Sequence, residues 1–277
     1  MTDKAIDPAQ YLSFVLFLER ACGIALGDSK QYLVRSRLSS LAIRFHFDSI
    51  NSFIDAVVKG NREYQAAAIE AMTTNETLWF RDQYPFQLLE KNVLSQFQNQ
   101  SRRLRVWSAA CSSGQEAYSI AMTILNYQKQ HQSSFRSGIE IIGTDISQQM
   151  VQRCKDAEYD QLDLARGLPE QFRKDYFEPT SSSKMKLTAK VRALANFRTI
   201  NLLDSYSSLG RFDIVFCRNV LIYFSGDVKK QILQKIAACL QDGGILFLGA
   251  SESIADLSER FATVRCNPGL YYLKKPQ

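Results

Sequence analysis

The chain has 277 residues, of which 45% are hydrophobic and 22% are charged. This composition allows one sizeable core with a smaller appended unit, and it excludes disorder as the main state. The 34 Lys and Arg residues against 28 Asp and Glu residues give a net charge of +6, which is too small to imply general coating of nucleic acid.

Several classes of protein are disfavoured by local features of the sequence. No segment approaches the roughly 18 consecutive apolar residues that cross a bilayer, and residues 1–10 are polar with both charge signs, unlike a signal peptide. We therefore expect a cytoplasmic protein without membrane insertion. The six cysteines form no C-x-x-C pair and the two histidines are far apart, so we predict neither disulfides nor a metal site.

The N-terminal part has a helical pattern. From Tyr11 to about Ala71, apolar residues recur at three- and four-residue spacing, which predicts a small all-α domain over residues 1–73. Within it, Lys30, Arg37 and Arg44 recur every seven residues and would line one edge of a helix, in a stretch without acidic residues. This basic ridge is either a binding surface or an ordinary solvated face. Nucleic acid is a weak candidate for it, because there is little sign of the alternating basic and aromatic residues that base stacking needs.

The remainder, residues 74–277, has the pattern of an α/β fold. Short apolar runs alternate with stretches of helical period, which predicts a mostly parallel sheet with helices on both faces. The expected strands are 104–109, 139–142, 197–200, 212–217 and 245–248, and the expected helices include 115–130 and 228–240. Residues 262–275 predict an antiparallel hairpin around Asn267-Pro268-Gly269. A polar region at about 156–196 interrupts this alternation, and we interpret it as an insertion.

The first two strand ends have features of a nucleoside site. The first strand runs into Ala110-Cys111-Ser112-Ser113-Gly114, whose small side chains would let the backbone approach a ligand. Alternatively, this segment is a tight strand-to-helix turn whose small residues serve packing alone. The second strand ends at Asp145, about thirty residues later, where a carboxylate grips ribose hydroxyls in such folds. Alternatively, Asp145 caps the following helix.

Two further strand ends are polar in the same way. Asn201-Leu202 follows one strand and Arg218-Asn219 follows another. Because the carboxyl ends of parallel strands lie at one edge of a sheet, these segments together predict a rim around one adenosine-sized pocket.

Three motifs resemble a known family. The stretches TNETLWFRD (residues 74–82), VWSAACSSGQE (106–116) and FCRNVLIYF (216–224) are similar to the hallmarks of CheR-type chemoreceptor glutamate methyltransferases, in the same order over nearly the whole chain. The resemblance implies a class I S-adenosylmethionine-dependent methyltransferase fold, Rossmann-like, with a small all-α N-terminal domain and an inserted β-subdomain. It also implies methyl transfer to glutamates on the cytoplasmic methylation helices of chemoreceptors, with S-adenosylhomocysteine as product.

The resemblance also implies site residues. Those expected around the cofactor are Asn75, Thr77, Arg81, Glu116, Asp145, Asn201, Leu202, Arg218 and Asn219. Arg81 and Tyr223 match family residues near the transferring methyl group and are the expected catalytic residues. An ionised carboxylate attacks a sulfonium methyl without a general base, which suits a site without histidine.

Chemistry suggests a role for several of these side chains. Glu116 and Asp145 would accept hydrogen bonds from the methionyl amine or ribose hydroxyls, and Arg81 would pair with a carboxylate of the cofactor or of the incoming glutamate. The Tyr223 hydroxyl would fix one carboxylate oxygen, or else the ring packs beneath the sheet edge.

The resemblance also bears on substrate docking. The ridge Lys30, Arg37 and Arg44 would bind acidic receptor helices. Glu178 to Lys186 lacks the glycine-rich turn of relatives that dock a receptor's C-terminal pentapeptide tether, so we expect methylation without tether docking.

Rival interpretations remain at this point. They are a catalytically silent S-adenosylmethionine-binding adaptor and a methyltransferase of the same fold acting on another substrate. A nicotinamide dehydrogenase is disfavoured because G-x-G-x-x-G is absent. We expect a monomer and no nucleic-acid partner.

Overall fold

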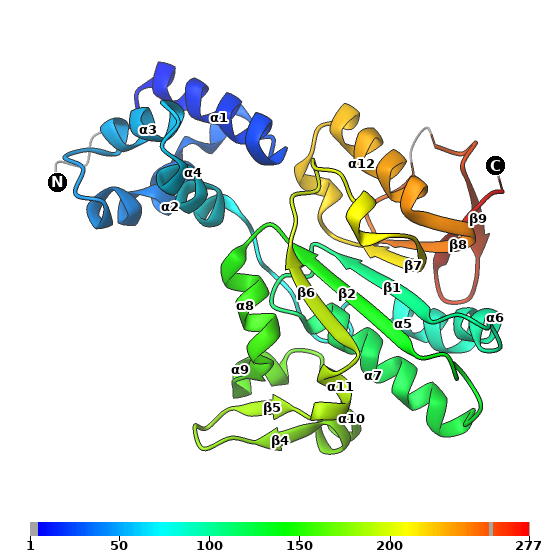
Figure 1. Cartoon of the computed structure of the whole chain (residues 1–277). Helices are drawn as coiled ribbons and strands as arrows, with labels where there is room; N and C mark the ends of the chain where they lie inside the picture. The colour runs from blue at the N-terminus through cyan, green and yellow to red at the C-terminus, as the bar shows by residue number, and fades with distance from the viewer. Residues whose placement is uncertain (1–4, 255–256, 277) are drawn as a thin grey trace. The chain divides into compact units, whose positions relative to one another are not determined.

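The computed structural model describes residues 5–254 and 257–276 (Figure 1). They divide into two units. The first comprises residues 5–74 together with Tyr223–Val228, and the second comprises Asn75–Ile222 together with the described residues from Lys229 onward.

The first unit is a helical bundle, as predicted. Its helices are α1 (Pro8–Cys22), α2 (Gln31–Arg44), α3 (Ile50–Val58) and α4 (Arg62–Met72), with a 3-10 turn at Asp28–Lys30. The helix boundaries follow local chemistry, because Ser49 and Asn61 cap the amino ends of α3 and α4 with side-chain oxygens. Gly23 ends α1 in the left-handed region, at φ 79°. Leu18, Leu38 and Phe53 are fully buried in this bundle.

The second unit is built on a seven-stranded sheet in the order β6-β2-β1-β7-β8-β10-β9. The strands are β1 (Leu104–Ala109), β2 (Ile139–Asp145), β6 (Ala195–Thr199), β7 (Phe212–Cys217), β8 (Leu240–Leu248), β9 (Phe261–Arg265) and β10 (Leu270–Lys274). The first five strands in this order pair in parallel, whereas β10 is antiparallel to β8 and β9. This confirms the mostly parallel sheet with a C-terminal antiparallel hairpin.

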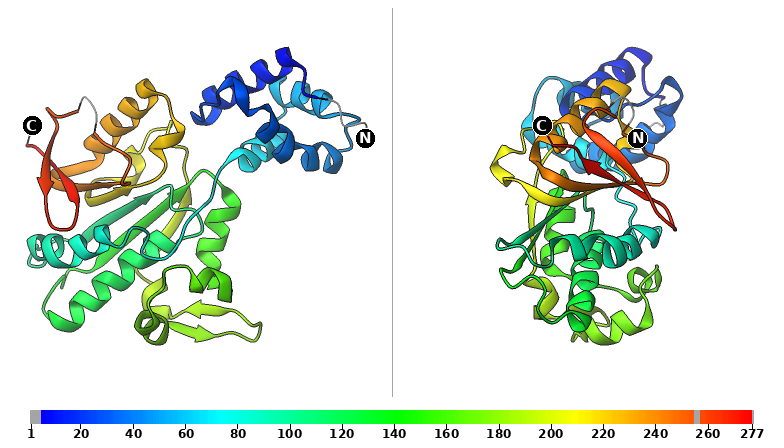
Figure 2. Two further views of the ribbon diagram at one scale, coloured as in Figure 1. Left: turned by 180° about the vertical axis from the view of Figure 1, so that it is seen from behind. Right: turned by 90° about the vertical axis from the view of Figure 1, so that its right-hand side faces the viewer.

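Helices cover both faces of the sheet. They are α5 (Tyr84–Leu88), a π-helical segment (Leu89–Val93), α6 (Leu94–Phe97), α7 (Gln115–Gln130), α8 (Gln148–Asp156) and α12 (Gly226–Cys239). Figures 1 and 2 show α7 and α12 on opposite faces. Every residue of β7 is buried, as expected for a central parallel strand that is covered on both sides.

A small β-subdomain lies in the chain where the insertion was predicted. It contains β3 (Glu158–Tyr159), β4 (Phe177–Pro179) and β5 (Met185–Leu187) in the antiparallel order β3-β5-β4. Three short helices accompany them: α9 (Gln161–Ala165), α10 (Glu170–Tyr176) and α11 (Ala189–Arg192).

Aromatic packing anchors this subdomain to the main fold. The buried Trp79 ring lies 4.8 Å from that of Tyr159 and 5.4 Å from that of Phe177. Gly167, at φ +89°, lets the chain pass Trp79, because a Cβ there would lie 2.3 Å from the Trp79 carbonyl oxygen.

Within residues 5–254 and 257–276, none of the helices combines the length and hydrophobicity of a bilayer span. The same residues contain no group of three or more His, Cys, Asp or Glu side chains placed to hold a metal ion. All six cysteines are free.

Candidate active site

Four strand ends meet at one edge of the sheet. The parallel register places Ala109 of β1 opposite Thr144 and Cys217, and Asp145 of β2 opposite Thr199. The segments that follow β1, β2, β6 and β7 therefore lie side by side at their carboxyl ends. This is the arrangement that the polar strand ends predicted.

The turn between β1 and α7 has an unusual backbone. Ala110, Ser112 and Gly114 have φ values of 59°, 49° and 95°, in the left-handed region that costs a non-glycine residue about 1–3 kcal/mol. Gly114 leaves no room for a side chain, because a Cβ would lie 3.0 Å from the Tyr159 hydroxyl oxygen. The Ser112 hydroxyl donates to the carbonyl oxygen of Asn75 at 2.8 Å. These contacts hold a strained turn at the centre of the edge, as is common at ligand sites.

Asp145, the last residue of β2, binds this turn through hydrogen bonds of its carboxylate. Its side chain is buried, and its carboxylate accepts the backbone N–H of Ser112 at 2.7 Å and that of Ser147 at 3.0 Å. Ser147 is the N-cap of α8, with its hydroxyl oxygen accepting the N–H of Met150 at 3.0 Å. The alternative that Asp145 itself caps α8 is therefore wrong.

Arg218 forms the centre of an ion cluster with the largely buried Glu116 and the more exposed Asp82, here called the Arg218 cluster. The Arg218 side chain is 1% exposed and donates to a Glu116 carboxylate oxygen at 3.0 Å and to an Asp82 oxygen at 2.8 Å. It also donates to the carbonyl oxygen of Arg81 at 2.9 Å. The other Glu116 oxygen accepts the hydroxyl of Ser108 at 2.7 Å. The cluster thus joins β1, the first turn of α7, the end of β7 and the segment that contains Arg81.

Burial dominates the electrostatics of this edge. It raises the pKa of Glu116, and the Arg218 guanidinium and the Ser108 hydroxyl offset only part of the increase. A hydrogen bond with Cys154 and burial raise the pKa of the Cys111 thiol well above its usual value, and the Asp145 and Glu116 carboxylates add to the increase. The Asp145 and Glu116 carboxylates therefore both affect the pKa of a thiol in the turn between β1 and α7. A thiol with such a raised pKa stays protonated and is not a nucleophile.

Glu252, which follows β8, is a site residue that the sequence reasoning missed. One carboxylate oxygen accepts the N–H groups of Leu221 and Ile222 at 2.8 and 3.3 Å. The other accepts those of Asn219 and Gly249 at 2.8 and 2.7 Å. Glycine fits at position 249, since a Cβ there would lie 2.9 Å from the backbone nitrogen of Asn219. The available signal was Gly249-Ala250-Ser251-Glu252, three small residues and a carboxylate directly after the predicted strand 245–248.

Two buried polar atoms at this edge have no hydrogen-bond partner among the described residues. They are Asn219 Oδ1 and Arg218 Nε. Asn219 is held at φ 57°, and its backbone N–H is bound by Glu252. A buried acceptor without a donor is costly in a native protein unless water or a ligand supplies one. Asn219 Oδ1 fits a ligand with an N–H or O–H group, such as adenine, ribose or a methionyl ammonium.

The remaining predicted cofactor residues lie in the second unit, and several of them make contacts within the protein. Arg81 donates to the carbonyl oxygen of Glu76 at 3.0 Å, and Thr77 is half-buried. Asn201 Oδ1 accepts the N–H of Leu203 at 3.0 Å, so it supports its own turn. Leu202 is buried, and its carbonyl oxygen accepts the Tyr206 hydroxyl.

Tyr223 and the basic ridge belong to the first unit. Tyr223 ends a 3-10 turn, and its carbonyl oxygen accepts the N–H of Ala25 at 2.9 Å. Arg37 donates to the carbonyl oxygens of Met72 and Thr73 at 2.7 and 2.8 Å, and so caps the carboxyl end of α4. Lys30, which precedes α2, and Arg44, its last residue, are exposed.

Comparison with known proteins agrees with this geometry. Residues 75–270 match the family model described as CheR methyltransferase, SAM binding domain, and residues 9–73 match CheR methyltransferase, all-alpha domain. A chemotaxis protein methyltransferase of Vibrio anguillarum is 51% identical over 99% of this chain and all of its own length. Cher2 of Pseudomonas putida is 48% identical over 95% of this chain and 96% of its own. The chain therefore belongs to the CheR methyltransferase family, and its cofactor is S-adenosylmethionine.

Proposed function

We propose that this protein transfers the methyl group of S-adenosylmethionine to glutamate side chains of chemoreceptors. The observation that carries the proposal is the edge of the sheet where Asp145 holds the strained turn after β1, and where Glu116 and the unsatisfied Asn219 Oδ1 follow the neighbouring strands β1 and β7. The relatives named chemotaxis protein methyltransferase support the signalling context.

The residues of this edge fit the cofactor. When bound, S-adenosylmethionine supplies a sulfonium methyl group that an ionised carboxylate can attack. Asp145 and Asn219 offer acceptors for ribose hydroxyls and amino groups, and Glu116 offers an acceptor for the methionyl ammonium. The turn from Ala110 to Gly114 has small side chains and lets the backbone approach the ligand. Asn75, Thr77, Asn201 and Leu202 would complete the surroundings.

The chain has the chemistry that methyl transfer to a carboxylate requires. The substrate oxygen is already ionised, so the protein has to align it and exclude water rather than remove a proton. A hydrogen bond with Cys154 together with burial raises the pKa of Cys111 well above its usual value, and burial does the same for Cys217, so neither thiol is a thiolate that competes for the methyl group. Among the described residues, Arg81 has one side-chain hydrogen bond, and its other N–H groups suit a carboxylate of the cofactor or substrate.

We propose that the receptor docks through attraction between basic side chains of this protein and acidic side chains of the receptor. Lys30 and Arg44 are exposed cations that would attract acidic methylation helices, whereas Arg37 would support them by capping α4.

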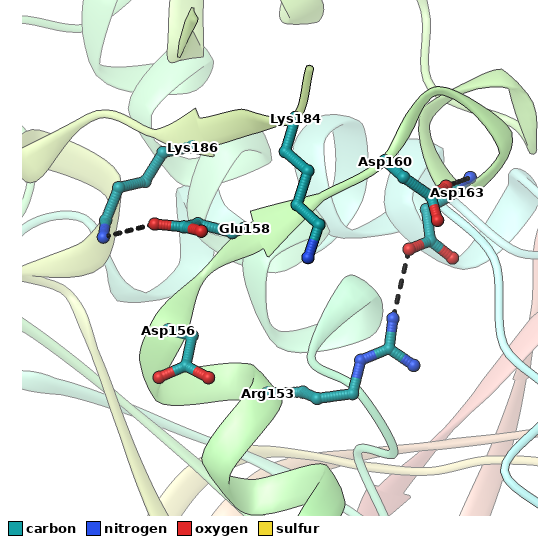
Figure 3. A pocket seen from close by; sticks show the side chains of 7 residues that line it. All are labelled: Arg153, Asp156, Glu158, Asp160, Asp163, Lys184 and Lys186. Atoms are coloured by element: carbon teal, nitrogen blue, oxygen red, sulfur yellow. Dashed lines mark hydrogen bonds and ion pairs between the residues drawn. The ribbon is translucent and has the colours of Figure 1, made fainter. Parts of the chain in front are cut away.

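The β-subdomain favours methylation without the pentapeptide tether. A peptide that adds as a strand needs a row of unpaired backbone groups, but the outer strands β3 and β4 have two and three residues, and β4 ends in Pro179. A cavity of about 330 Å³ lies between α8 and this subdomain, and Figure 3 shows two ion pairs among its charged lining residues. Lys186 pairs with Glu158 at 3.0 Å, and Arg153 pairs with Asp163 at 3.1 Å.

The test of the function is methylation of a receptor fragment with radiolabelled S-adenosylmethionine. We expect label that mild base releases, because a glutamyl methyl ester is base-labile, and no label when the methylation-site glutamates are changed to alanine. Base-stable label would indicate another substrate class. No label despite normal binding of S-adenosylhomocysteine would indicate a silent adaptor.

The tether is tested with the same receptor fragment, with and without its C-terminal pentapeptide. We expect equal initial rates of methylation, because the β-subdomain offers no extended edge. A rate that requires the pentapeptide, or calorimetric binding of the free pentapeptide at micromolar concentration, would contradict tether independence.

The role of Tyr223 is tested by Tyr223→Phe. Loss of a hydroxyl that fixes the attacking carboxylate should reduce kcat by roughly 10- to 100-fold and leave the affinity for S-adenosylhomocysteine unchanged. Tyr32→Phe, in the same unit, is the matched control and should have full activity. Unchanged turnover in Tyr223→Phe would remove this hydroxyl from the mechanism.

A further inference from the structure

A second charged surface lies at β6, the outer strand of the sheet, away from the candidate active site around Asp145. The sequence between Glu178 and Asp204 contains no acidic residue but has five basic ones: Lys184, Lys186, Lys190, Arg192 and Arg198. The later part of this stretch forms α11 and β6, and β6 is the last strand of the seven-stranded sheet.

The outer side of β6 has unpaired backbone groups. Ile141 donates its N–H to the carbonyl oxygen of Leu194 at 2.8 Å, and Ile200 donates its N–H to that of Asp145 at 2.9 Å. Even-numbered residues of this segment therefore face β2. Since alternate residues of a strand present their N–H and C=O groups to opposite sides, Ala195, Phe197 and Thr199 present theirs outward. No backbone partner for these groups occurs in the part of the chain that the structure describes.

A cavity of about 390 Å³ runs beside this edge. Tyr118 and Phe197, whose rings are 5.3 Å apart, and Ile142 contribute apolar surface. Lys155 from α8, Arg192 from α11 and Arg198 from β6 line it with cations. Because Ile142 lies in the middle of β2, this cavity is distinct from the site around Asp145 at the end of that strand.

The three cations that line this cavity are not neutralised by a carboxylate of the cavity. Its only lining carboxylate, Glu140, is already engaged by Arg105 at 2.6 Å and by Arg103 at 3.8 Å. None of Lys155, Arg192 and Arg198 has an ion-pair partner among the described residues, and Arg192 instead donates to the carbonyl oxygen of Leu187 at 3.0 Å. The cavity therefore attracts negative charge.

We propose that β6 and this cavity bind an extended acidic segment of a partner protein, which adds to the sheet as an eighth strand. Backbone groups of Ala195, Phe197 and Thr199 would pair with the segment. Successive side chains of a strand alternate between the two faces of a sheet, so acidic side chains on one face of the segment would meet Arg198 and those on the other face would meet Lys155 and Arg192. Protection of an exposed edge against aggregation is the simpler role for a charged residue on a strand. However, Lys155 and Arg192 come from helices that do not form the edge, so edge protection does not account for them.

The probe for this site is a fluorescently labelled oligoglutamate peptide, which has carboxylates on both faces of a strand, titrated into the full-length protein and followed by fluorescence anisotropy. We expect saturable binding that Arg198→Glu and Lys155→Glu each weaken by about tenfold. Lys184→Glu is the matched control, since Lys184 lies in the same basic stretch but outside this cavity, and it should leave binding unchanged. Unfolding midpoints and the affinity for S-adenosylhomocysteine should equal those of the wild type in all three variants.

Strand addition itself is tested with the peptide backbone. Alternate amides of an added strand point toward β6 and away from it. N-methylation of every second amide should therefore abolish binding when the methylated amides are those that face β6, and should be tolerated when they are those that face away. Absence of binding, or equal loss in Lys184→Glu, would overturn the proposal. Binding that ignores the methylation phase and is displaced by tripolyphosphate would also overturn it, because the site would then be a simple anion cluster.

Discussion

Arg218→Met is expected to lower the free energy of unfolding by about 3–5 kcal/mol, the cost of removing one partner from a buried ion pair, here the pair of Arg218 with Glu116. The substitution keeps most of the buried volume but leaves the Glu116 and Asp82 carboxylates without their shared cation. Urea or guanidinium unfolding, followed by circular dichroism, measures the loss. The matched control is Lys174→Met, because its ion pair with Glu170 is exposed and should contribute less than about 1 kcal/mol.

A second substitution separates the charge effect from the packing effect. Arg218→Met combined with Glu116→Gln should recover part of the loss, because the buried uncompensated carboxylate is then absent. Equal destabilisation of the single and double variants would show that the ion pair contributes little.

The same variant should change how stability depends on pH. Burial raises the pKa of Glu116 in the folded protein, so its protonated form favours folding at low pH, and this contribution is lost as the pH rises through the folded pKa. Arg218 opposes that increase, and its removal moves the folded pKa further up. The loss of stability in Arg218→Met should therefore be larger at neutral pH than near the ordinary pKa of glutamate, about 4.3.

Asp145→Ala is expected to weaken binding of S-adenosylhomocysteine by about 100-fold. Two effects combine: a carboxylate acceptor for the ribose is lost, and the N–H groups of Ser112 and Ser147 lose theirs, so the strained turn is no longer fixed. Each hydrogen bond to a charged group contributes about 1.5–3 kcal/mol, and about 2.8 kcal/mol corresponds to 100-fold in affinity. Isothermal titration calorimetry measures the change.

The control for this change is Asp204→Ala, an exposed carboxylate beyond the neighbouring strand end, which should bind the product as the wild type does. Asp145→Asn should retain part of the affinity, since its amide oxygen still accepts one N–H group. Wild-type affinity in Asp145→Ala would show that this carboxylate serves the fold alone.

The elements that could be read from the sequence were those with strong local patterns. The predicted strand 104–109 and helix 115–130 agree with β1 and α7 at both ends. The strand is mostly apolar, and Gly114 precedes the first residue of the helix. The parallel order of the strands placed the polar segments at one edge, and the sheet confirms this arrangement.

What the sequence could not show depends on long-range contacts. Asp82 pairs with Arg218 across 136 positions, and Arg37 contacts residues 34–37 positions away. No periodicity identifies such partners. Likewise, Glu252 acts through backbone N–H groups, which leave no signature in the identity of the residues that it binds. The residues from Leu221 to Tyr223 form a 3-10 turn, in which Glu252 accepts the N–H groups of Leu221 and Ile222.

The packing of Trp79 makes the inserted subdomain part of the enzyme's hydrophobic core. The indole is fully buried between Tyr159 and Phe177, and the same segment continues directly to Arg81. A truncated protein lacking residues 158–187 would leave this large ring in water and loosen the chain that presents the arginine. Excision should therefore yield an aggregating, inactive protein rather than a minimal catalyst.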